Sequence, residues 1–153
     1  MVTQDPLEKL RPARIEDIGG VLRLLEPLES DGTLVKRGRD LLEMEIERFF
    51  VLEHDQEILG CAALYPYGDG MAELAGLAVH PDHRGAGAGE RLLQAIEARA
   101  KQRKVKRLFV LTTRTAHWFI ERGFHVAPVT ELPRRRQDLY NYQRRSQILA
   151  KRL

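Results

Sequence analysis

The chain has 153 residues, of which 43% are hydrophobic and 31% charged, as in an ordinary globular domain with one sizeable core. Its apolar runs are all shorter than the roughly 18 residues of a membrane span, and its first residues lack the apolar core of a signal peptide. We therefore expect a cytoplasmic protein without membrane contact. The single cysteine, Cys61, excludes an intrachain disulfide, and its apolar surroundings predict a buried side chain.

The first half of the chain predicts two helices followed by three strands. Apolar residues recur at helical spacing over residues 17–29, with Asp17 as the N-terminal cap, and residues 37–49 predict a second, short helix. Residues 49–81 then alternate β-type runs with the turn sequences "HDQE" and "YGDG". These turns predict strands joined as antiparallel hairpins.

The second half predicts alternating helices and strands. An apolar stripe of one amphipathic helix follows a glycine-rich stretch, and consists of Leu92, Leu93, Ile96 and Ala100. Residues 107–113 form an apolar run of strand length, residues 116–124 predict a short helix ended by Gly123, and residues 138–149 predict a long last strand. The whole order is β-α-α-β-β-β-α-β-α-β-β, an α/β protein with a mixed sheet.

Positive charge is concentrated at the end of the chain. Residues 131–153 carry a net charge of +5 within a total of +3, which leaves −2 for the rest. Three interpretations are open: a solvated basic surface or frayed tail, a nucleic-acid patch in which Tyr140 and Tyr142 interleave with arginines, or arginines that bind a small acidic substrate.

The stretch "VHPDHRGAGAGERLL", residues 79–93, predicts an anion-binding loop. Glycines let a ligand approach the backbone closely, and the helix that follows supplies unpaired N–H groups and the positive end of its dipole. A phosphate or pyrophosphate suits such a loop, and Arg84 adds positive charge. A P-loop is excluded because Glu90 follows Gly89, and a Rossmann unit would have one strand before the loop where this chain has three.

The same stretch resembles the acetyl-CoA motif of the GNAT N-acetyltransferases, Arg/Gln-x-x-Gly-x-Gly/Ala, through Arg84, Gly87 and Gly89. The resemblance implies the GNAT fold, with a mixed central sheet of about six or seven strands, a splayed strand pair that forms the CoA slot, and about four helices. It also implies that Leu77, Ala78 and Val79 pair with the pantetheine arm of acetyl-CoA. The pyrophosphate would be held by Arg84, Gly85, Ala86, Gly87, Ala88, Gly89 and Glu90.

Longer stretches, such as "LFVLTTRTAHWFIERGF" and "LYNYQRRSQIL", resemble one branch of that family, the acetyltransferase domain of bacterial N-acetylglutamate synthases. In that branch the domain follows an amino-acid-kinase-like domain. The resemblance therefore implies a longer parent chain, with residues 1–10 as a linker remnant and residues 11–153 as one acetyltransferase domain. A homo-oligomer is left open.

The implied reaction moves the acetyl group of acetyl-CoA to the α-amine of L-glutamate by direct attack in a ternary complex. The amine must first lose a proton, and Glu73, on a strand face shared with Ala75 and Leu77, is the predicted general base. Thr112 is a candidate acid or hydrogen-bond donor to the leaving thiol, although a threonine is also common at a strand end. The family's frequent tyrosine acid is replaced by Phe119, and His117 is an alternative donor.

A glutamate substrate needs cations for two carboxylates. Lys36, Arg37, Arg39, Arg144 and Ser146 are the candidates, and Arg114 could face either ligand. The resemblance favours Arg37, Arg144 and Ser146. The alternatives are another amine acceptor or a non-catalytic module that binds acetyl-CoA. We expect no metal and no nucleic-acid partner, because the five histidines form no ligand-spaced cluster and the chemistry needs neither.

Overall fold

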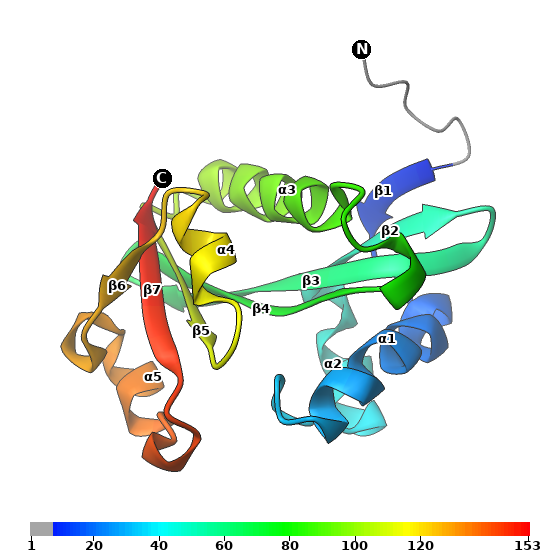
Figure 1. The fold of residues 1–153 in the computed structure, drawn as a ribbon. Helices are drawn as coiled ribbons and strands as arrows, with labels where there is room; N and C mark the ends of the chain where they lie inside the picture. Colours follow the sequence, from blue (N-terminus) through cyan, green and yellow to red (C-terminus); the bar gives the residue numbers. More distant parts are fainter. Residues whose placement is uncertain (1–7) are drawn as a thin grey trace. The chain divides into compact units, whose positions relative to one another are not determined.

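The computed structural model describes residues 8–153, apart from the side chain of Gln143. The helices and strands along the chain are β1 (Glu8–Pro12), α1 (Ile18–Ser30), α2 (Arg39–Glu45), β2 (Phe49–His54), β3 (Glu57–Gly68), β4 (Met71–Val79), α3 (Ala88–Gln102), β5 (Arg107–Thr112), α4 (Ala116–Ile120), β6 (His125–Ala127), α5 (Arg134–Asp138) and β7 (Gln147–Arg152). This order confirms the prediction, with one additional short helix, α5 (Figure 1).

The strands form one seven-stranded sheet in the order β1-β2-β3-β4-β5-β7-β6. β4 and β5 pair in parallel over only three residue pairs, from Met71 with Arg107 to Glu73 with Phe109, whereas β5–β7 and β6–β7 are antiparallel. The sheet is therefore mixed, and the short β4–β5 pairing agrees with the predicted strand pair that separates.

The described residues group into two compact units. The first unit runs to Ala63 and includes Gly76–Ile96, and the second comprises Leu64–Ala75 and Glu97–Leu153. Each unit is described separately below.

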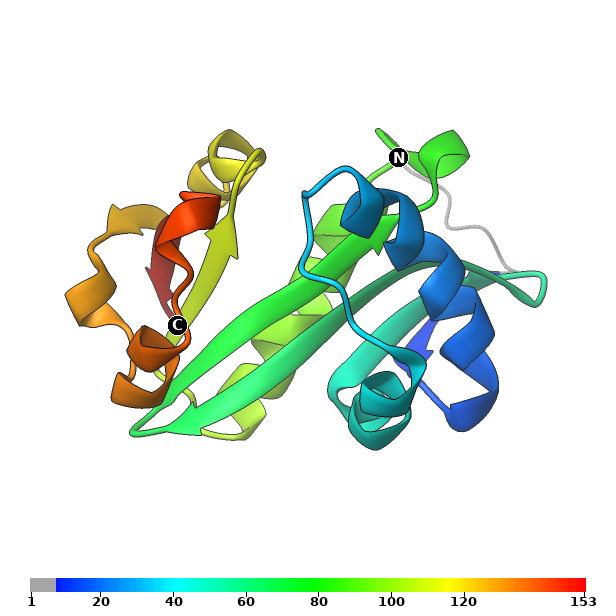
Figure 2. The same ribbon diagram turned by 90° about the horizontal axis from the view of Figure 1, so that it is seen from below.

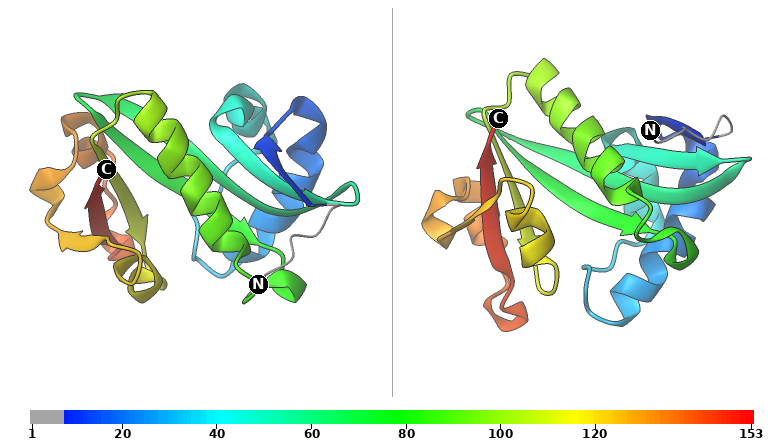
Figure 3. Two further views of the ribbon diagram at one scale, coloured as in Figure 1. Left: turned by 90° about the horizontal axis from the view of Figure 1, so that it is seen from above. Right: turned by 45° about the horizontal axis from the view of Figure 1, so that its top comes forward.

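In the first unit, β1, β2 and β3 form an antiparallel meander with helices on both faces. α1 and α2 lie on one face and the N-terminal part of α3 on the other (Figures 1 and 3). Gly60 permits this close packing, because a Cβ built there would stand 2.8 Å from Leu92. Residues 8–10, which the sequence assigned to an N-terminal segment, belong to β1 because Glu8 already pairs with His54. Residues 1–7 of that segment lie outside the described residues.

The start of α1 differs from the prediction. Asp17 does not cap the helix with its side chain; its carboxylate instead accepts hydrogen bonds from Arg11 Nη1, at 2.7 Å, and from the Arg14 backbone N–H, at 2.7 Å. A guanidinium fork matches a carboxylate better than single helix N–H groups do, which explains the preference.

The second unit consists of β5, β7 and β6 side by side, with the adjoining ends of β3 and β4 and the helices α4 and α5 (Figure 2). Its buried cluster contains Phe109, Ala127, Leu132, Ile148 and Ala150. α5 has the sequence RRRQD, which carries no apolar periodicity. This explains why the sequence did not predict it.

The predicted long last strand over residues 138–149 is wrong over most of its length. Tyr142–Arg144 is a single 3₁₀ turn, and Arg145 has a left-handed φ of +54°. Extended backbone starts only at Gln147. The Tyr140 hydroxyl also donates to the Ser146 carbonyl at 2.7 Å, and this closes residues 140–146 into a loop.

In the described part of the chain, no helix is both long and apolar enough to cross a membrane.

Candidate functional site

The glycine loop of the first unit connects the end of β4 to the start of α3, as predicted. Gly85 and Gly87 have left-handed φ values of +84° and +82°, which favour glycine over any other residue. Residues 84–87 are exposed, and α3 begins at Ala88. The first N–H groups of this 15-residue helix therefore lie beside an exposed, glycine-rich turn, an arrangement that suits a phosphate.

Neighbouring residues hold the loop at both ends. Arg84 Nε donates to the Val79 carbonyl at 3.3 Å, so Arg84 folds back toward the end of β4. His80 Nδ1 accepts the Asp82 N–H at 3.1 Å, and the His80 N–H donates to Leu59 of β3 at 2.7 Å. At the helix end, Arg91 Nη1 donates to the Ala86 carbonyl at 3.2 Å.

Arg37 lies against β4 within the first unit. Its Nη1 is 3.7 Å from the position that a Cβ would take on Gly76, and the ring of Phe49 is 3.2 Å from that position. Gly76 has a left-handed φ of +62°. This φ interrupts the alternation of side chains along β4. The strand face predicted for Glu73 and Ala75 therefore cannot be followed on to Leu77.

Cys61 of β3 contacts Gly76 and is fully buried, as predicted. Its thiol donates to the Gly76 carbonyl at 3.4 Å. Burial raises the pKa of the Cys61 thiol to about 12, against a smaller opposing effect of the Arg37 charge. A thiol of this kind stays protonated and unreactive at neutral pH.

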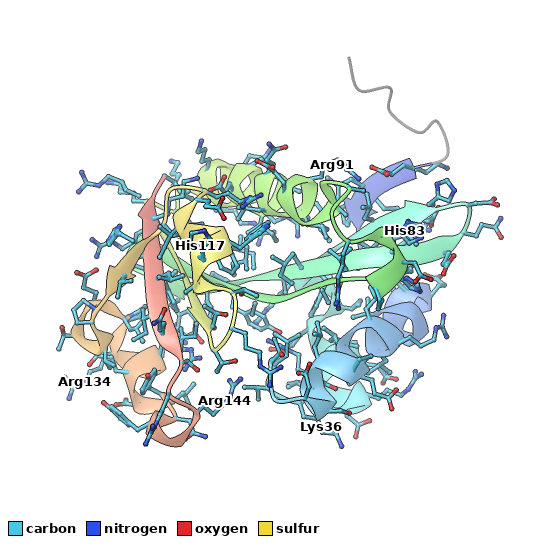
Figure 4. The ribbon with its side chains drawn as sticks, in the orientation of Figure 1. Lys36, His83, Arg91, His117, Arg134 and Arg144 are labelled. Atoms are coloured by element: carbon cyan, nitrogen blue, oxygen red, sulfur yellow. The ribbon has the colours of Figure 1, made fainter. Side chains whose placement is uncertain are left out.

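The other cations of the same segment, Lys36 and Arg39, are exposed. Lys36 is labelled in Figure 4, and Arg39 pairs with Glu43 at 3.8 Å. Of the three basic candidates in "LVKRGRD", the structure thus brings only Arg37 against β4.

In the second unit, Glu73 and Arg136 form a largely buried polar cluster. Glu73 is 9% exposed. Its Oε1 accepts hydrogen bonds from Arg136 Nε at 2.8 Å and from the Tyr67 hydroxyl at 3.4 Å. Burial, followed by the negative charge of Glu73, raises the pKa of Tyr67. The predicted base is therefore held in one orientation by a cation and a phenol.

α5 supplies a second arginine to this cluster. Arg135 Nη2 donates to the Tyr67 carbonyl at 2.9 Å, and its guanidinium carbon lies 5.2 Å from the centroid of the Tyr67 ring. Sequence reasoning did not select Arg135 or Arg136. The basic segment was noted, but only the helix geometry shows that Arg136 turns inward while Arg134 is exposed (Figure 4).

Thr112 ends β5 and has a clear local role. Its hydroxyl accepts the Thr115 N–H at 3.0 Å and the Arg114 N–H at 3.3 Å, and lies 2.8 Å from the Thr115 hydroxyl. These contacts form the turn that leads into α4. The hydroxyl thus shapes this turn, and its predicted role near the leaving thiol stays a prediction.

The structure also shows where the other two positions considered for a proton donor, Phe119 and His117, lie. Phe119 is 3% exposed and packs edge-to-face on Trp118 and Phe124, with centroid distances of 4.9 and 5.3 Å. His117 is an exposed residue on α4, 3.3 Å from Glu121 (Figure 4). Phe119 is therefore a core residue, and His117 a surface one.

Arg144, labelled in Figure 4, ends the 3₁₀ turn, and Ser146 directly precedes β7. Ser146 is 8% exposed and Arg144 half-buried, and the left-handed Arg145 stands between them. Arg114 is exposed. Within the second unit, the structure thus pairs Glu73 with Arg136 and places Arg144 and Ser146 in the same loop.

Comparison with known proteins decides the family. The model of the acetyltransferase (GNAT) family matches residues 20–125, which include the glycine loop, Glu73 and Thr112. The chain belongs to the GNAT acetyltransferase family. Its fold and its strand–glycine loop–helix element are accordingly those of a GNAT protein.

Individual relatives place the chain within the GNAT family. It is 58% identical to an amino-acid acetyltransferase of Ralstonia nicotianae and 56% identical to one of Azotobacter vinelandii, in both cases over 100% of this chain. Among solved structures it resembles N-acetylglutamate synthase from Neisseria gonorrhoeae, complexed with coenzyme A and N-acetyl-glutamate. The TM-score is 0.94 and the identity 41%, over 99% of this chain.

The chain spans about a third of the length of these relatives: 34% and 36% of the two acetyltransferases and 36% of the synthase. Among the described residues, no group of three or more histidines, cysteines or acidic residues could hold a metal ion.

Proposed function

We propose that this chain transfers the acetyl group of acetyl-CoA to the α-amine of L-glutamate, in the cytoplasm and as part of a longer parent chain with an amino-acid-kinase-like domain. One observation carries the proposal: the likeness over 99% of the chain to a synthase that was solved with coenzyme A and N-acetyl-glutamate. The glycine loop and the Glu73 cluster described above support the proposal, and the roles of individual residues are part of it.

Acetyl-CoA is assigned to the glycine loop and the end of β4. The N–H groups around Gly85, Gly87 and Gly89, together with the dipole of α3, suit the pyrophosphate. The backbone of Leu77, Ala78 and Val79 is assigned to the pantetheine arm, and Arg84 adds positive charge beside the loop.

Glu73 is assigned as the general base. The amine of glutamate is mostly protonated at neutral pH, so a proton must leave before nitrogen attacks the thioester carbonyl. Glu73 takes this proton, directly or through water, the C–N bond forms, the C–S bond breaks, and the thiolate takes a proton. Thr112 is assigned to that last proton or to a hydrogen bond with the sulfur, because Phe119 has no proton to donate.

The two carboxylates of glutamate are assigned to Arg37, Arg144 and Ser146. Cations in these positions favour a dicarboxylate over a polyamine, which would require acidic residues. Arg135 and Arg136 add positive charge in the second unit, although Arg136 is already engaged by Glu73.

The test is to incubate the purified chain with acetyl-CoA and L-glutamate, and to follow free CoA thiol beside a panel of α-amino acids and one polyamine. Thiol release that is selective for glutamate would support the proposal. Release with another amine but not with glutamate would refute the substrate. Acetyl-CoA binding without any release, also after fusion to a kinase-like domain, would indicate a non-catalytic module, and no binding would refute the assignment of acetyl-CoA.

A further inference from the structure

Arg91 connects the glycine loop to the first strand of the chain. It lies in the first turn of α3, at the end of the helix that carries the loop (Figure 4). Its Nε is 2.8 Å from Glu8 Oε1 and its Nη2 is 3.2 Å from Glu8 Oε2, while Nη1 donates to the Ala86 carbonyl at 3.2 Å. One guanidinium thus holds a loop carbonyl and a β1 carboxylate together.

The contact is partly sheltered from solvent. The side chains of Arg91 and Glu8 are 33% and 23% exposed, respectively. Arg91 Nη1 also lies 3.2 Å from the position that a Cβ would take on Gly87, so the guanidinium packs beside the left-handed turn. A planar guanidinium can make these contacts at once, whereas a lysine ammonium is a single point charge.

The loop needs such an anchor. Its glycines lose more conformational freedom on ordering than other residues, and an unrestrained loop would lose that freedom when a ligand binds. A contact that holds the Ala86 carbonyl in place removes part of this loss before binding, which is the effect of preorganisation.

We propose that Arg91 is a positioning residue for the acetyl-CoA pyrophosphate loop, and that Glu8 of β1 holds Arg91 in place. The order of the loop then depends on the pairing of β1 with β2. The proposal rests on the assignment of acetyl-CoA to this loop.

The two roles that Arg91 could have predict opposite effects of Glu8→Gln on CoA binding. If Arg91 were a direct phosphate ligand, Glu8 would compete with the phosphate, and Glu8→Gln would strengthen CoA binding. If Arg91 positions the loop, the same change loosens its anchor and weakens CoA binding, although it removes a negative charge near an anion site.

The experiment is calorimetric titration of CoA into the full chain and its variants. We expect Glu8→Gln and Arg91→Lys each to weaken CoA binding by about fivefold, the size typical of a partly exposed charge-assisted pair. The matched controls, Glu26→Gln on the exposed side of α1 and Arg103→Lys near the end of α3, should leave affinity unchanged. In turnover assays the effect should fall on the KM of acetyl-CoA, with kcat and the KM of glutamate preserved.

Thermal unfolding without ligand, for each variant, separates positioning from general stability. Stronger or unchanged CoA binding by a folded Glu8→Gln variant would overturn the proposal, and so would an equal loss in the control variants. A folded wild-type chain that does not bind CoA would instead overturn the proposed function, and the loop assignment with it.

Discussion

At the scale of single residues, Arg136 holds the side chain of Glu73, the proposed general base, in place. Its Nε lies 2.8 Å from Glu73 Oε1, in a cluster with both side chains largely buried. We expect Arg136→Ala to lower kcat by about tenfold or more, because a misplaced base loses much of its effect. Arg136→Lys should restore part of it, and the KM of acetyl-CoA should stay constant. Steady-state kinetics with Arg134→Ala, an exposed neighbour on the same helix, as control would test this. Equal losses in both variants would show that α5 merely stabilises the unit.

Gly87 gives a second prediction at this scale. Its φ of +82° is strained for any residue with a Cβ, and a Cβ there would stand 3.2 Å from Arg91 Nη1. We expect Gly87→Val to weaken CoA binding by tenfold or more, roughly the effect of 1–2 kcal/mol of left-handed strain in the loop. Gly32→Val is the matched control, because Gly32 has a φ of +83° with nothing within 4 Å of an added Cβ. Loss of CoA binding in the control as well would trace the effect to folding.

The sequence predicts a functional residue when the pattern that marks it lies in neighbouring residues of the chain. Glu73 and the glycines were found because a motif and a strand pattern surround them. Arg136 was not, because its partner lies 63 positions away and three consecutive arginines look alike. Only the rotation of α5 distinguishes Arg136, bound to Glu73, from the exposed Arg134.

At the scale of elements, the loop of residues 140–146 determines where Arg144 and Ser146 lie. The Tyr140 hydroxyl closes it through a 2.7 Å hydrogen bond to the Ser146 carbonyl. Tyr140→Phe removes this bond and keeps the ring. We expect the KM of glutamate to rise by about fivefold, the effect of about 1 kcal/mol, with the KM of acetyl-CoA unchanged.

Tyr142→Phe is the control for this loop, because the Tyr142 ring packs edge-to-face on Tyr140, with centroids 4.6 Å apart, but Tyr142 is 69% exposed. A similar rise in the glutamate KM for both variants, or a rise in both Michaelis constants, would contradict the role of the hydrogen bond.

The sequence-based prediction was wrong for this same loop. The sequence over 138–149 predicts a strand, but it does not show the left-handed Arg145 or the hydrogen bond that closes the loop. β5 was predicted from its continuous apolar run, and α3 from apolar residues that recur at helical spacing.

At the scale of the whole molecule, some charged residues near both ends of the chain form contacts within the fold. The C-terminal basic segment is not a frayed tail, because Arg135, Arg136 and Lys151 bind Tyr67, Glu73 and Glu97, respectively. At the other end, Arg11 of β1 forms two hydrogen bonds to Asp17 and one to Glu53 of β2. Such networks fasten strand and helix ends by charge, so the stability of the fold must depend on pH.

The Arg11 network gives the sign of that dependence. The hydrogen bonds from Arg11 hold the pKa of Asp17 below its ordinary value. A carboxylate with a lowered folded-state pKa contributes stability that is fully present above its unfolded-state pKa, near about 4, and is lost as the pH falls through the lower folded-state value. Asp17→Asn should therefore cost about 2 kcal/mol at neutral pH, because it leaves Arg11 with one carboxylate fewer, and the deficit should shrink as acid protonates the wild-type side chain.

Urea unfolding from neutral pH down to about pH 3 measures this difference at each step. Glu16→Gln, one residue before Asp17 and exposed, is the control and should follow the wild-type curve. A deficit of Asp17→Asn that stays constant through the acid range would mean that the amide disturbs packing and that the charge pair does not provide the stability. A deficit that disappears with acid would assign the pH dependence of the first unit to the contact between β1 and the start of α1.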